Sequence, residues 1–493
     1  MIDGRRKTDA RAASLALLTL LAASGCSPRS TLDAEALAAM TPLPMSYFVA
    51  DVFSDRATLW ARCGSGDEIV VDLAPGDGEA LRAPVDRDRD RTARLELRDL
   101  QPGQRYRYSI WCAGGQIAAP SVGTFRTPPA PDEHAPVRFA WFGDVGGQNV
   151  CRDADRGYLP FQQVLSTLPD FSIFLRAMIY VVDSCRVRGR HRDALVVAPP
   201  GPARTLDEYR AHWRYGRADR YLQRALAGSG TYPVWDDHEI RNDAGPAHDH
   251  PPYRPWVDLI PTARRAFLEY NPIAADDPSA PLYRSVRWGR HLEMFLLDTR
   301  SHRDGNGESD HPGKTLLGAE QKRWLLDGLQ ASDATWKIVV SSVPISVPTG
   351  SDAIGRDGWA SGDSDLGFET ELREILQTMQ RLTKRQIVWI TTDVHFGTVM
   401  RYTPFPGDPD FVIHEVVTGP LQAGVFPRSE RDPTFHPETL YQHGPADGEA
   451  IDSLPQAMRW FNFGWIEIDA AGSLVAEIVT GTGERAYRLE LRP

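Results

Sequence analysis

Acidic and imidazole side chains follow short apolar runs at several points of this sequence. The most distinct case is Tyr-Pro-Val-Trp-Asp-Asp-His-Glu at 232–239, in which the apolar run 232–235 is typical of the end of a buried strand. In an α/β sheet, ligands bind outside the carboxyl ends of the strands. Oxygen donors and a histidine at such a place suit a hard or borderline metal ion. A solvated turn that caps a helix is the alternative interpretation.

Two further runs end in the same way. A stretch of β-branched and apolar residues at 386–392 leads to Asp393 and His395, which are two positions apart and so share one face of a strand. The apolar run 137–142 leads to Gly143 and Asp144, followed by glycines that let the backbone approach a bound anion. Each signal alone is typical of a structural turn, but together they indicate metal binding.

These blocks occur along the chain in the order found in the PhoD-like alkaline phosphatases, a branch of the calcineurin-like metallophosphoesterases. The sequence resembles that family over roughly residues 47–493. The resemblance implies that His238 protonates the leaving oxygen or stabilises the developing charge, and that Arg210, in a helix expected over 204–226, contacts phosphate. It also implies a set of metal ligands, completed by an amide suited to calcium: Asp144, Tyr180, Asp237, Asn242, Asp393 and His395.

The sequence departs from the family pattern at one place. After the apolar run 171–175 the family has Gly-Asp, and its Asp bridges two metal ions; this chain has Arg176 and Ala177. A shared carboxylate offsets the repulsion of two cations about 3.5–4 Å apart, and an arginine adds positive charge near them. Three interpretations stay open: Asp183 reaches into the site, the site holds fewer ions, or turnover is lost.

The resemblance implies an exported metal-dependent enzyme that hydrolyses phosphate mono- or diesters with a metal-activated water. The expected cofactor is a dinuclear or multinuclear metal site, with ferric iron and calcium implied by the family and manganese or zinc as alternatives. The alternative function follows from Ala177. It is a degenerate phosphatase-fold lipoprotein that binds phosphorylated surface polymers or lipids without turnover.

The elements that must position these residues suggest two folded units. Short alternating runs separated by Gly, Asp and Pro over residues 42–127 predict a β-sandwich, and Leu-Gln-Pro-Gly at 100–103 before Tyr-Arg-Tyr resembles a hairpin of fibronectin type III-like domains. The proline-rich segment 128–136 reads as a linker. Residues 137–493 are expected to form an α/β unit, a metallophosphoesterase-type β-sandwich flanked by helices.

Composition narrows the class of partner. The chain has 493 residues and a formal net charge of -11, which argues against a nucleic-acid-binding surface. We expect a monomer whose partner is a phosphate-ester substrate. We expect association with a membrane only through a lipid anchor at the amino terminus.

The amino terminus and the cysteines indicate export. Basic residues precede a small-and-leucine run at 12–23, as in a signal peptide over residues 1–26, and small residues before Cys26 resemble a bacterial lipoprotein signal. We therefore expect a periplasmic protein or a membrane-anchored lipoprotein of a bacterium, with a soluble secreted form still open. Four other cysteines remain, and the simplest pairing within each region joins Cys63 to Cys112 and Cys151 to Cys185; free buried thiols are the alternative.

Overall fold

The computed structural model describes most of the chain after the expected signal segment. The described residues are 45–76, 78–115, 120–182, 185–246, 255–273, 279–351, 355–382 and 386–493. Residues 1–26, with Cys26, and Asp183 lie outside them. None of the helices within the described residues is both long enough and apolar enough to cross a membrane.

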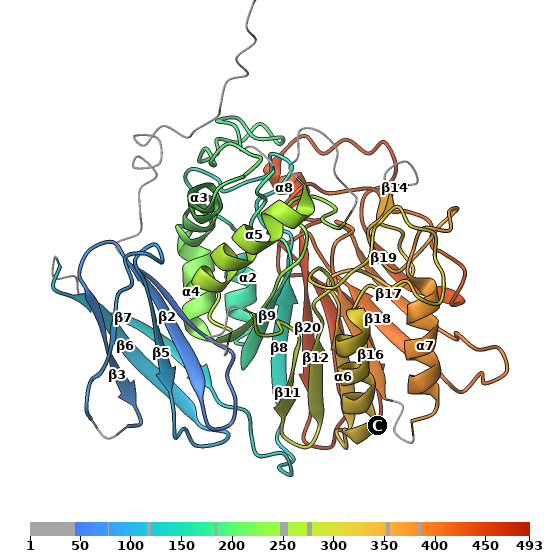
Figure 1. Cartoon of the computed structure of the whole chain (residues 1–493), viewed down its shortest axis with the longest axis horizontal. Helices are drawn as coiled ribbons and strands as arrows, with labels where there is room; N and C mark the ends of the chain where they lie inside the picture. Colours follow the sequence, from blue (N-terminus) through green and yellow to red (C-terminus); the bar gives the residue numbers. More distant parts are fainter. Residues whose placement is uncertain are drawn as a thin grey trace, which may run out of the picture.

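The amino-terminal part is an all-β sandwich, drawn in blue at the left of Figure 1. One of its sheets is formed by β1 (Met45–Ala50), β2 (Ala57–Cys63) and β5 (Thr92–Leu97). The other has the order β4-β3-β6-β7 and contains β3 (Glu68–Ala74), β4 (Leu81–Pro84), β6 (Arg105–Ala113) and β7 (Ser121–Arg126). Apolar side chains of both sheets, such as Leu59 and Ile110, are fully buried between them.

This sandwich is joined to the rest of the molecule through a shared sheet. Strand β1 pairs in parallel with β10 (Gly230–Val234), and Ala50 is opposite Thr231. The resulting sheet has nine strands in the order β22-β21-β20-β8-β9-β10-β1-β2-β5. The periodicity of the sequence indicated two units but gave no sign of this continuity, because strand pairing across 180 residues leaves no local pattern.

The second large sheet faces the first across the main core. The remaining strands of the nine-stranded sheet are β8 (Val137–Phe142), β9 (Phe171–Leu175), β20 (Asn462–Ile468), β21 (Leu474–Thr480) and β22 (Arg485–Leu491). The opposing seven-stranded sheet has the order β11-β12-β13-β16-β18-β17-β19. Its strands are β11 (Arg284–Trp288), β12 (Leu292–Leu296), β13 (Trp336–Val340), β16 (Ile387–Thr391), β17 (Gly397–Tyr402), β18 (Ile413–Val417) and β19 (Pro437–His443). One apolar cluster contains Ile173 of the first sheet and Ile338 and Ile390 of the second.

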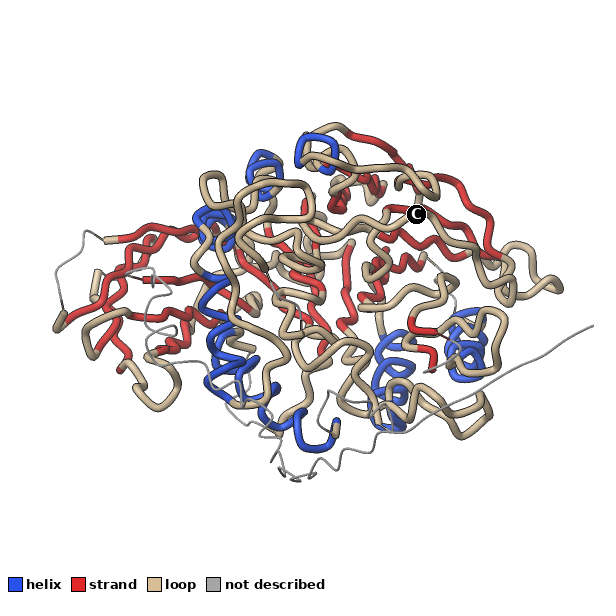
Figure 2. The backbone as a smooth tube through the Cα atoms, turned by 90° about the horizontal axis from the view of Figure 1, so that it is seen from above, coloured by secondary structure: helices blue, strands red, loops and turns tan. Residues whose placement is uncertain are grey.

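Helices cover the outer faces of this larger sandwich, so the expected fold class is confirmed; Figure 2 gives the view from above. The nine-stranded sheet is covered by α2 (Phe161–Ser166), α3 (Leu206–Arg217), α4 (Arg220–Gly228) and α5 (Trp256–Tyr270). The seven-stranded sheet is covered by α6 (Gly318–Ala331) and α7 (Glu369–Gln380). Two short strands, β14 (Gly350–Ser351) and β15 (Gly355–Arg356), and the short helix α8 (Leu454–Ala457) lie in connecting segments.

The helix expected over 204–226 is two helices. Helix α3 begins with a capping box in which the Thr205 hydroxyl accepts from the Glu208 amide and the Glu208 carboxylate accepts from the Thr205 amide. The Asp219 side chain then accepts from the Tyr221 and Leu222 amides. A second N-cap at this point starts α4, so α3 ends at Arg217.

The two sheets bring their carboxyl ends to one edge. Strands β8, β9 and β10 are parallel to one another in the first sheet, and β12, β13, β16 and β18 are parallel in the second. The segments that follow these strands therefore meet at the same end of the sandwich. This end carries the candidate site.

Candidate metal centre

Four strand ends deliver the polar groups of the site, and the backbone there is strained. Asp144 follows β8, Arg176 and Ala177 follow β9, and Asp393 and His395 follow β16. All five have positive φ, at 57°, 59°, 40°, 88° and 59° in that order. Each such residue costs roughly 1–3 kcal/mol, and clusters of them mark functional sites.

Three ligand-type atoms converge on one side of the centre. The Tyr180 hydroxyl lies 3.2 Å from His395 Nε2 and 3.4 Å from Asp144 Oδ1, and Nε2 lies 3.7 Å from Oδ1. His395 Nδ1 bonds to the Gly424 carbonyl oxygen, which can only accept, so Nδ1 carries the hydrogen. The lone pair of Nε2 then faces Tyr180 and Asp144. Burial lowers the pKa of His395, although Asp144 opposes this.

Glycines allow this approach. A Cβ at Gly147 would lie 2.4 Å from the Tyr180 ring, and one at Gly419, where φ is +109°, would lie 2.6 Å from Asp144 Oδ2. The backbone therefore comes closer to these two side chains than any other residue type permits.

The triangle of Asp144, Tyr180 and His395 fits a single metal ion. An ion with ligands about 2.0–2.2 Å away has neighbouring donor atoms roughly 3.0–3.6 Å apart. The three measured separations, 3.2, 3.4 and 3.7 Å, are close to that range. A phenol, a carboxylate and an imidazole with its second nitrogen anchored on a carbonyl are suitable donors for a transition metal.

The other side of the centre is filled by the guanidinium of Arg176. Its Nε lies 3.0 Å from Asp236 Oδ2 and 3.9 Å from Asp144 Oδ1. Its Nη2 donates to Asp237 Oδ1, and its Nη1 is in ionic contact with Asp393 Oδ1. The side chain is 1% exposed. Burial opposes its charge, but Asp237, Asp236 and Asp144 together raise the pKa of Arg176 above its ordinary value.

Asp236, which the sequence did not single out as a ligand, is held from behind. It accepts from Arg300 and from the hydroxyls of Thr299 and Ser342 at 3.0 and 2.8 Å. Burial acts to raise the pKa of Asp236, but Arg300 and Arg176 lower it below its ordinary value. Arg300 also binds both oxygens of Asp357, at 2.6 and 2.7 Å. Asp357 follows no long strand, so no pattern in the sequence could have identified it.

The segment after β10 supplies the remaining predicted groups. Asp237 Oδ1 accepts from the His238 amide at 2.8 Å, and Oδ2 accepts from the Asp243 amide at 2.9 Å. Oxygens of Asp237, Asp243 and Asp357 lie within 4.8 Å of one another. Burial, then Asp357 and Asp237, raise the pKa of Asp243 to about 8. Arg300 already binds both oxygens of Asp357, so this trio lies next to a fixed positive charge.

A cleft of about 290 Å³ opens beside the centre. The His238 ring lies over the Tyr180 ring with centroids 4.0 Å apart, and its Nδ1 is buried without a hydrogen-bond partner among the described residues. The cleft is lined by polar groups of the centre and by apolar side chains from three loops: Gln148, Asp237, His238, Asn242, Asp243, Val347, Pro348, Thr349, Gly350, Asp393, Val394, His395, Phe396, Phe426, Pro427 and Ser429.

Arg210 lies away from this cleft. Its Nε and Nη2 bind the two oxygens of Glu269 at 2.7 and 2.9 Å, and Nη2 also donates to the Asp88 carbonyl of the amino-terminal sandwich at 2.5 Å. It is not among the residues that line the cleft. In this arrangement Arg210 ties α3 to α5 and to the loop before β5.

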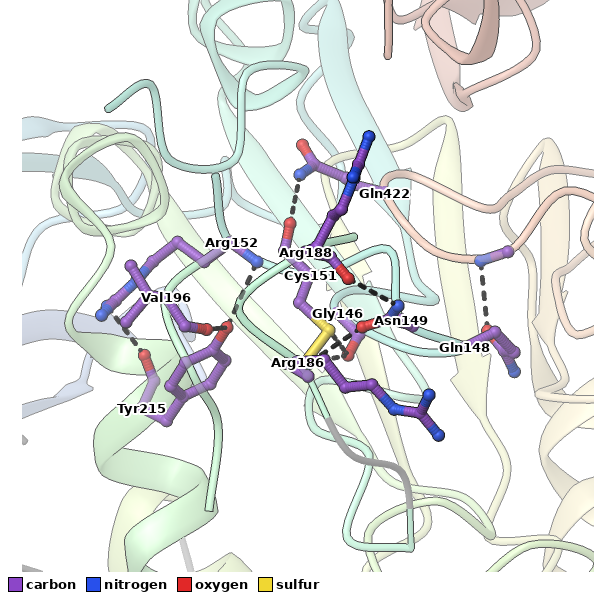
Figure 3. The surroundings of a disulfide bond; sticks show 12 residues. Gly146, Gln148, Asn149, Cys151, Arg152, Arg186, Arg188, Val196, Tyr215 and Gln422 are labelled. Atoms are coloured by element: carbon purple, nitrogen blue, oxygen red, sulfur yellow. Dashed lines mark hydrogen bonds between the residues drawn. A yellow bond between two sulfur atoms is a disulfide. The ribbon is translucent and has the colours of Figure 1, made fainter. Parts of the chain in front are cut away.

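Both expected disulfides are present, and one is next to the centre. Cys63 is bonded to Cys112, with their Cα atoms 6.0 Å apart, and Cys151 to Cys185, with their Cα atoms 5.9 Å apart. Figure 3 shows the second, whose sulfur atoms lie 3.3 and 3.7 Å from the Gly146 carbonyl oxygen.

Neighbouring bonds tie the same loop to other segments. The Cys151 carbonyl accepts from Gln422 at 2.8 Å, and Gln148 Oε1 accepts from the Gly424 amide at 3.1 Å. The Cys151–Cys185 disulfide itself links the segment after Asp144 to the segment after Tyr180.

The structure thus gathers most of the predicted ligands. Asp144, Tyr180 and His395 meet on one side, and Asp237 and Asp393 meet around Arg176 on the other. Ala177 is fully buried against Tyr180 and Ala423, and it offers no donor atom. Asn242 lines the cleft and is not part of the triangle.

Three comparisons place this fold and sequence among known proteins. The family model described as PhoD-like phosphatase matches residues 139–476. Alkaline phosphatase D of Bacillus subtilis (strain 168) is 25% identical over 400 residues, which is 72% of this chain. The chain spans 64% of the length of that relative.

Two solved structures share the fold. The structure of PhoD superposes with a TM-score of 0.71 at 18% identity and covers 92% of each chain. Purple acid phosphatase PPD1 from yellow lupin (Lupinus luteus) seeds superposes with a TM-score of 0.57 at 13% identity, over 91% of this chain and 74% of its own. Because the family model matches more than half of the sequence, the chain belongs to the PhoD-like phosphatase family.

Proposed function

We propose that this protein is an exported, metal-dependent phosphoesterase that hydrolyses phosphate mono- or diesters. The observation that supports this most strongly is the triangle of Asp144, Tyr180 and His395, which stands beside a cleft at the edge where the strand ends meet. The family and the fold class point to the same chemistry.

Asp144, Tyr180 and His395 would hold the metal ion. When bound, such an ion supplies Lewis acidity toward a phosphoryl oxygen and lowers the pKa of a coordinated water to about 7. By resemblance the metals are ferric iron and calcium, with manganese or zinc as alternatives. The hydrogen bond from His395 Nδ1 to Gly424 fixes the tautomer that this role requires.

His238 supplies the proton transfer in this proposal. It lines the cleft, its ring is packed on Tyr180, and its Nδ1 has no competing partner among the described residues. A positioned imidazole that protonates a leaving alkoxide contributes roughly 10²–10⁴-fold to the rate. Asp237 holds the backbone of His238 in place by accepting a hydrogen bond from the His238 amide.

Export is supported by the two disulfides, because such bonds persist in oxidising compartments. The proposal also includes a signal segment over residues 1–26 and a lipid anchor at Cys26, both of which lie outside the described residues. We further propose that the protein acts as a monomer, either periplasmic or anchored to the bacterial membrane by that lipid.

Release of phosphate and of chromophore from a chromogenic monoester and diester tests the function. The purified chain is assayed with added iron, calcium, manganese and zinc in turn, beside Asp144→Asn and His238→Asn. We expect metal-stimulated turnover that Asp144→Asn abolishes, and that His238→Asn lowers by about 10²–10⁴-fold without loss of bound metal. Wild-type turnover no higher than that of Asp144→Asn, with every metal, would reject the proposal.

The same assay separates two roles for Arg210. If Arg210 contacts phosphate, Arg210→Met raises KM for both esters. The contacts with Glu269 and the Asp88 carbonyl lead us to expect an unchanged KM and a lower free energy of unfolding, by about 1–3 kcal/mol. Denaturant unfolding and KM are measured on the same preparation.

A further inference from the structure

The two sides of the centre differ in the cation they are built for. Four carboxylates, those of Asp144, Asp236, Asp237 and Asp393, surround the guanidinium of Arg176 within 4.0 Å. All of these side chains are buried or nearly so. Clustered carboxylates without a cation would repel one another strongly in such an environment. In this chain the guanidinium of Arg176 is that cation.

The charges of the cluster leave room for one more ion. Arg300 and Arg303 reach the same network through Asp357, at 2.6 and 3.6 Å. Five carboxylates are in contact with these three guanidinium groups and exceed them by two negative charges, and Asp243 beside Asp237 and Asp357 adds a further acidic group. One divalent ion balances this difference, whereas two divalent ions would leave an excess of positive charge in a buried site.

Much of the carboxylate capacity on the Arg176 side is already in use. Asp237 uses Oδ1 for Arg176 and the His238 amide, and Oδ2 for the Asp243 amide. Asp236 is bound by Arg300, Thr299 and Ser342 as well as by Arg176. Ala177, where a bridging carboxylate would stand, is a buried methyl group. The two-ion arrangement expected from the family therefore does not fit these residues.

We propose that the centre binds a single metal ion on Asp144, Tyr180 and His395, and that the Arg176 guanidinium takes the place of a second ion. Arg176 is a positioning residue: it holds Asp236, Asp237 and Asp393 in place whether or not metal is bound. The inference rests on the proposed function only for the reaction assigned to this site. The ion count itself is independent of that reaction.

Counting bound metal tests this directly. The wild-type chain is incubated with excess iron, calcium, manganese and zinc, freed of loose ions by gel filtration, and analysed for all four elements. We expect a sum of one ion per chain. The double variant Arg176→Gly with Ala177→Asp removes the fixed cation and adds a carboxylate, and we expect it to hold two. Arg217→Met, which removes a buried arginine outside the cluster, should hold one.

Stability in a chelator provides a second measurement. We expect the thermal midpoint of the wild type to fall less in chelator than that of the double variant, because the wild type loses one ion and keeps the Arg176 charge among its carboxylates. The double variant should lose several degrees in chelator and regain them with manganese. If the double variant does not fold at all, the wild-type ion count alone decides the matter.

The outcomes separate this inference from the proposed function. A wild-type chain with two ions, or with none, overturns the inference, whatever its activity. A chain with one ion that hydrolyses no phosphate ester supports the inference and contradicts the proposed function. In that case binding of phosphorylated polymers or lipids without turnover becomes the function to test.

Discussion

The two sides of the centre use the same strand ends for different electrostatic purposes. On the Tyr180 side one carboxylate, one phenol and one imidazole meet, and Arg176 Nε lies 3.9 Å from the Asp144 oxygen. On the Arg176 side three further carboxylates close around a guanidinium. The first arrangement leaves donor atoms for an external ion, and the second satisfies its own charge. The pair Arg176 and Ala177 at the end of β9 thus divides the site into two unlike halves.

The largest expected effect comes from breaking the metal-binding side. Asp144→Asn removes the only carboxylate of the triangle, so we expect loss of the bound ion and a fall in kcat/KM of roughly 10³–10⁵-fold. Metal analysis and kinetics on the same sample check this. Asp170→Asn is the matched control, since Asp170 is also buried but pairs with Arg126 far from the cleft. A variant of Asp144 that keeps its ion would show that the triangle is not the metal site.

Removing the fixed cation should affect stability more than it affects metal content. Arg176→Met leaves four buried carboxylates without their central partner, and we expect a loss of about 3–5 kcal/mol in the free energy of unfolding. Denaturant unfolding in chelator measures it.

Arg217→Met gives the comparison for that loss. Arg217 is buried without a carboxylate partner, and burial lowers the pKa of Arg217 to about 9. It bonds to Asn271 Oδ1 at 2.6 Å and lies over the Phe48 ring. We expect Arg217→Met to cost clearly less than Arg176→Met. Equal losses would mean that the carboxylates around Arg176 impose no special demand.

The two disulfides allow a comparison between a bond next to the centre and a bond in the amino-terminal sandwich. Replacing both Cys151 and Cys185 by Ser should cost about 3–4 kcal/mol of stability and also weaken metal affinity, because that disulfide joins the segments carrying Asp144 and Tyr180. Replacing Cys63 and Cys112 should cost a similar amount of stability and leave metal affinity unchanged. Calorimetry of metal binding distinguishes the pairs, and an equal effect on affinity would contradict the local role.

The smallest expected effect concerns His212, a buried histidine outside the centre. Burial lowers the pKa of His212 to about 4, with partial opposition from a hydrogen bond to the Pro200 carbonyl. The unfolded chain then binds more protons than the folded one between about pH 6.5 and 4. Stability falls as pH falls through that window, by about 2–3 kcal/mol. His212→Asn should remove this part of the acid dependence of urea unfolding, and an unchanged profile would contradict it.

Local patterns in the sequence were enough to predict the class of fold and most of the side chains that the structure gathers at one edge of the sheets. Apolar runs ending in Asp144, Asp237 and Asp393 predicted strand ends with ligands, because side-chain type and strand periodicity are properties of short segments. The even number of cysteines after Cys26 and their proximity along the chain predicted both disulfides, which the structure confirms. The phosphate contact predicted for Arg210 came from the family resemblance of its helix, and the structure places that side chain against Glu269.

Only the tertiary structure decided how those residues share charge. The sequence shows that Arg176 and Ala177 replace Gly-Asp, but not whether the arginine turns outward or fills the centre. Its contacts with Asp236, Asp237 and Asp393 arise because three strands from distant parts of the chain end at one edge. Asp357 joins the same network through Arg300, from a loop that carries no periodic signal. Electrostatic energy depends on distances in space, and distances between remote segments are fixed only when the sheets have packed.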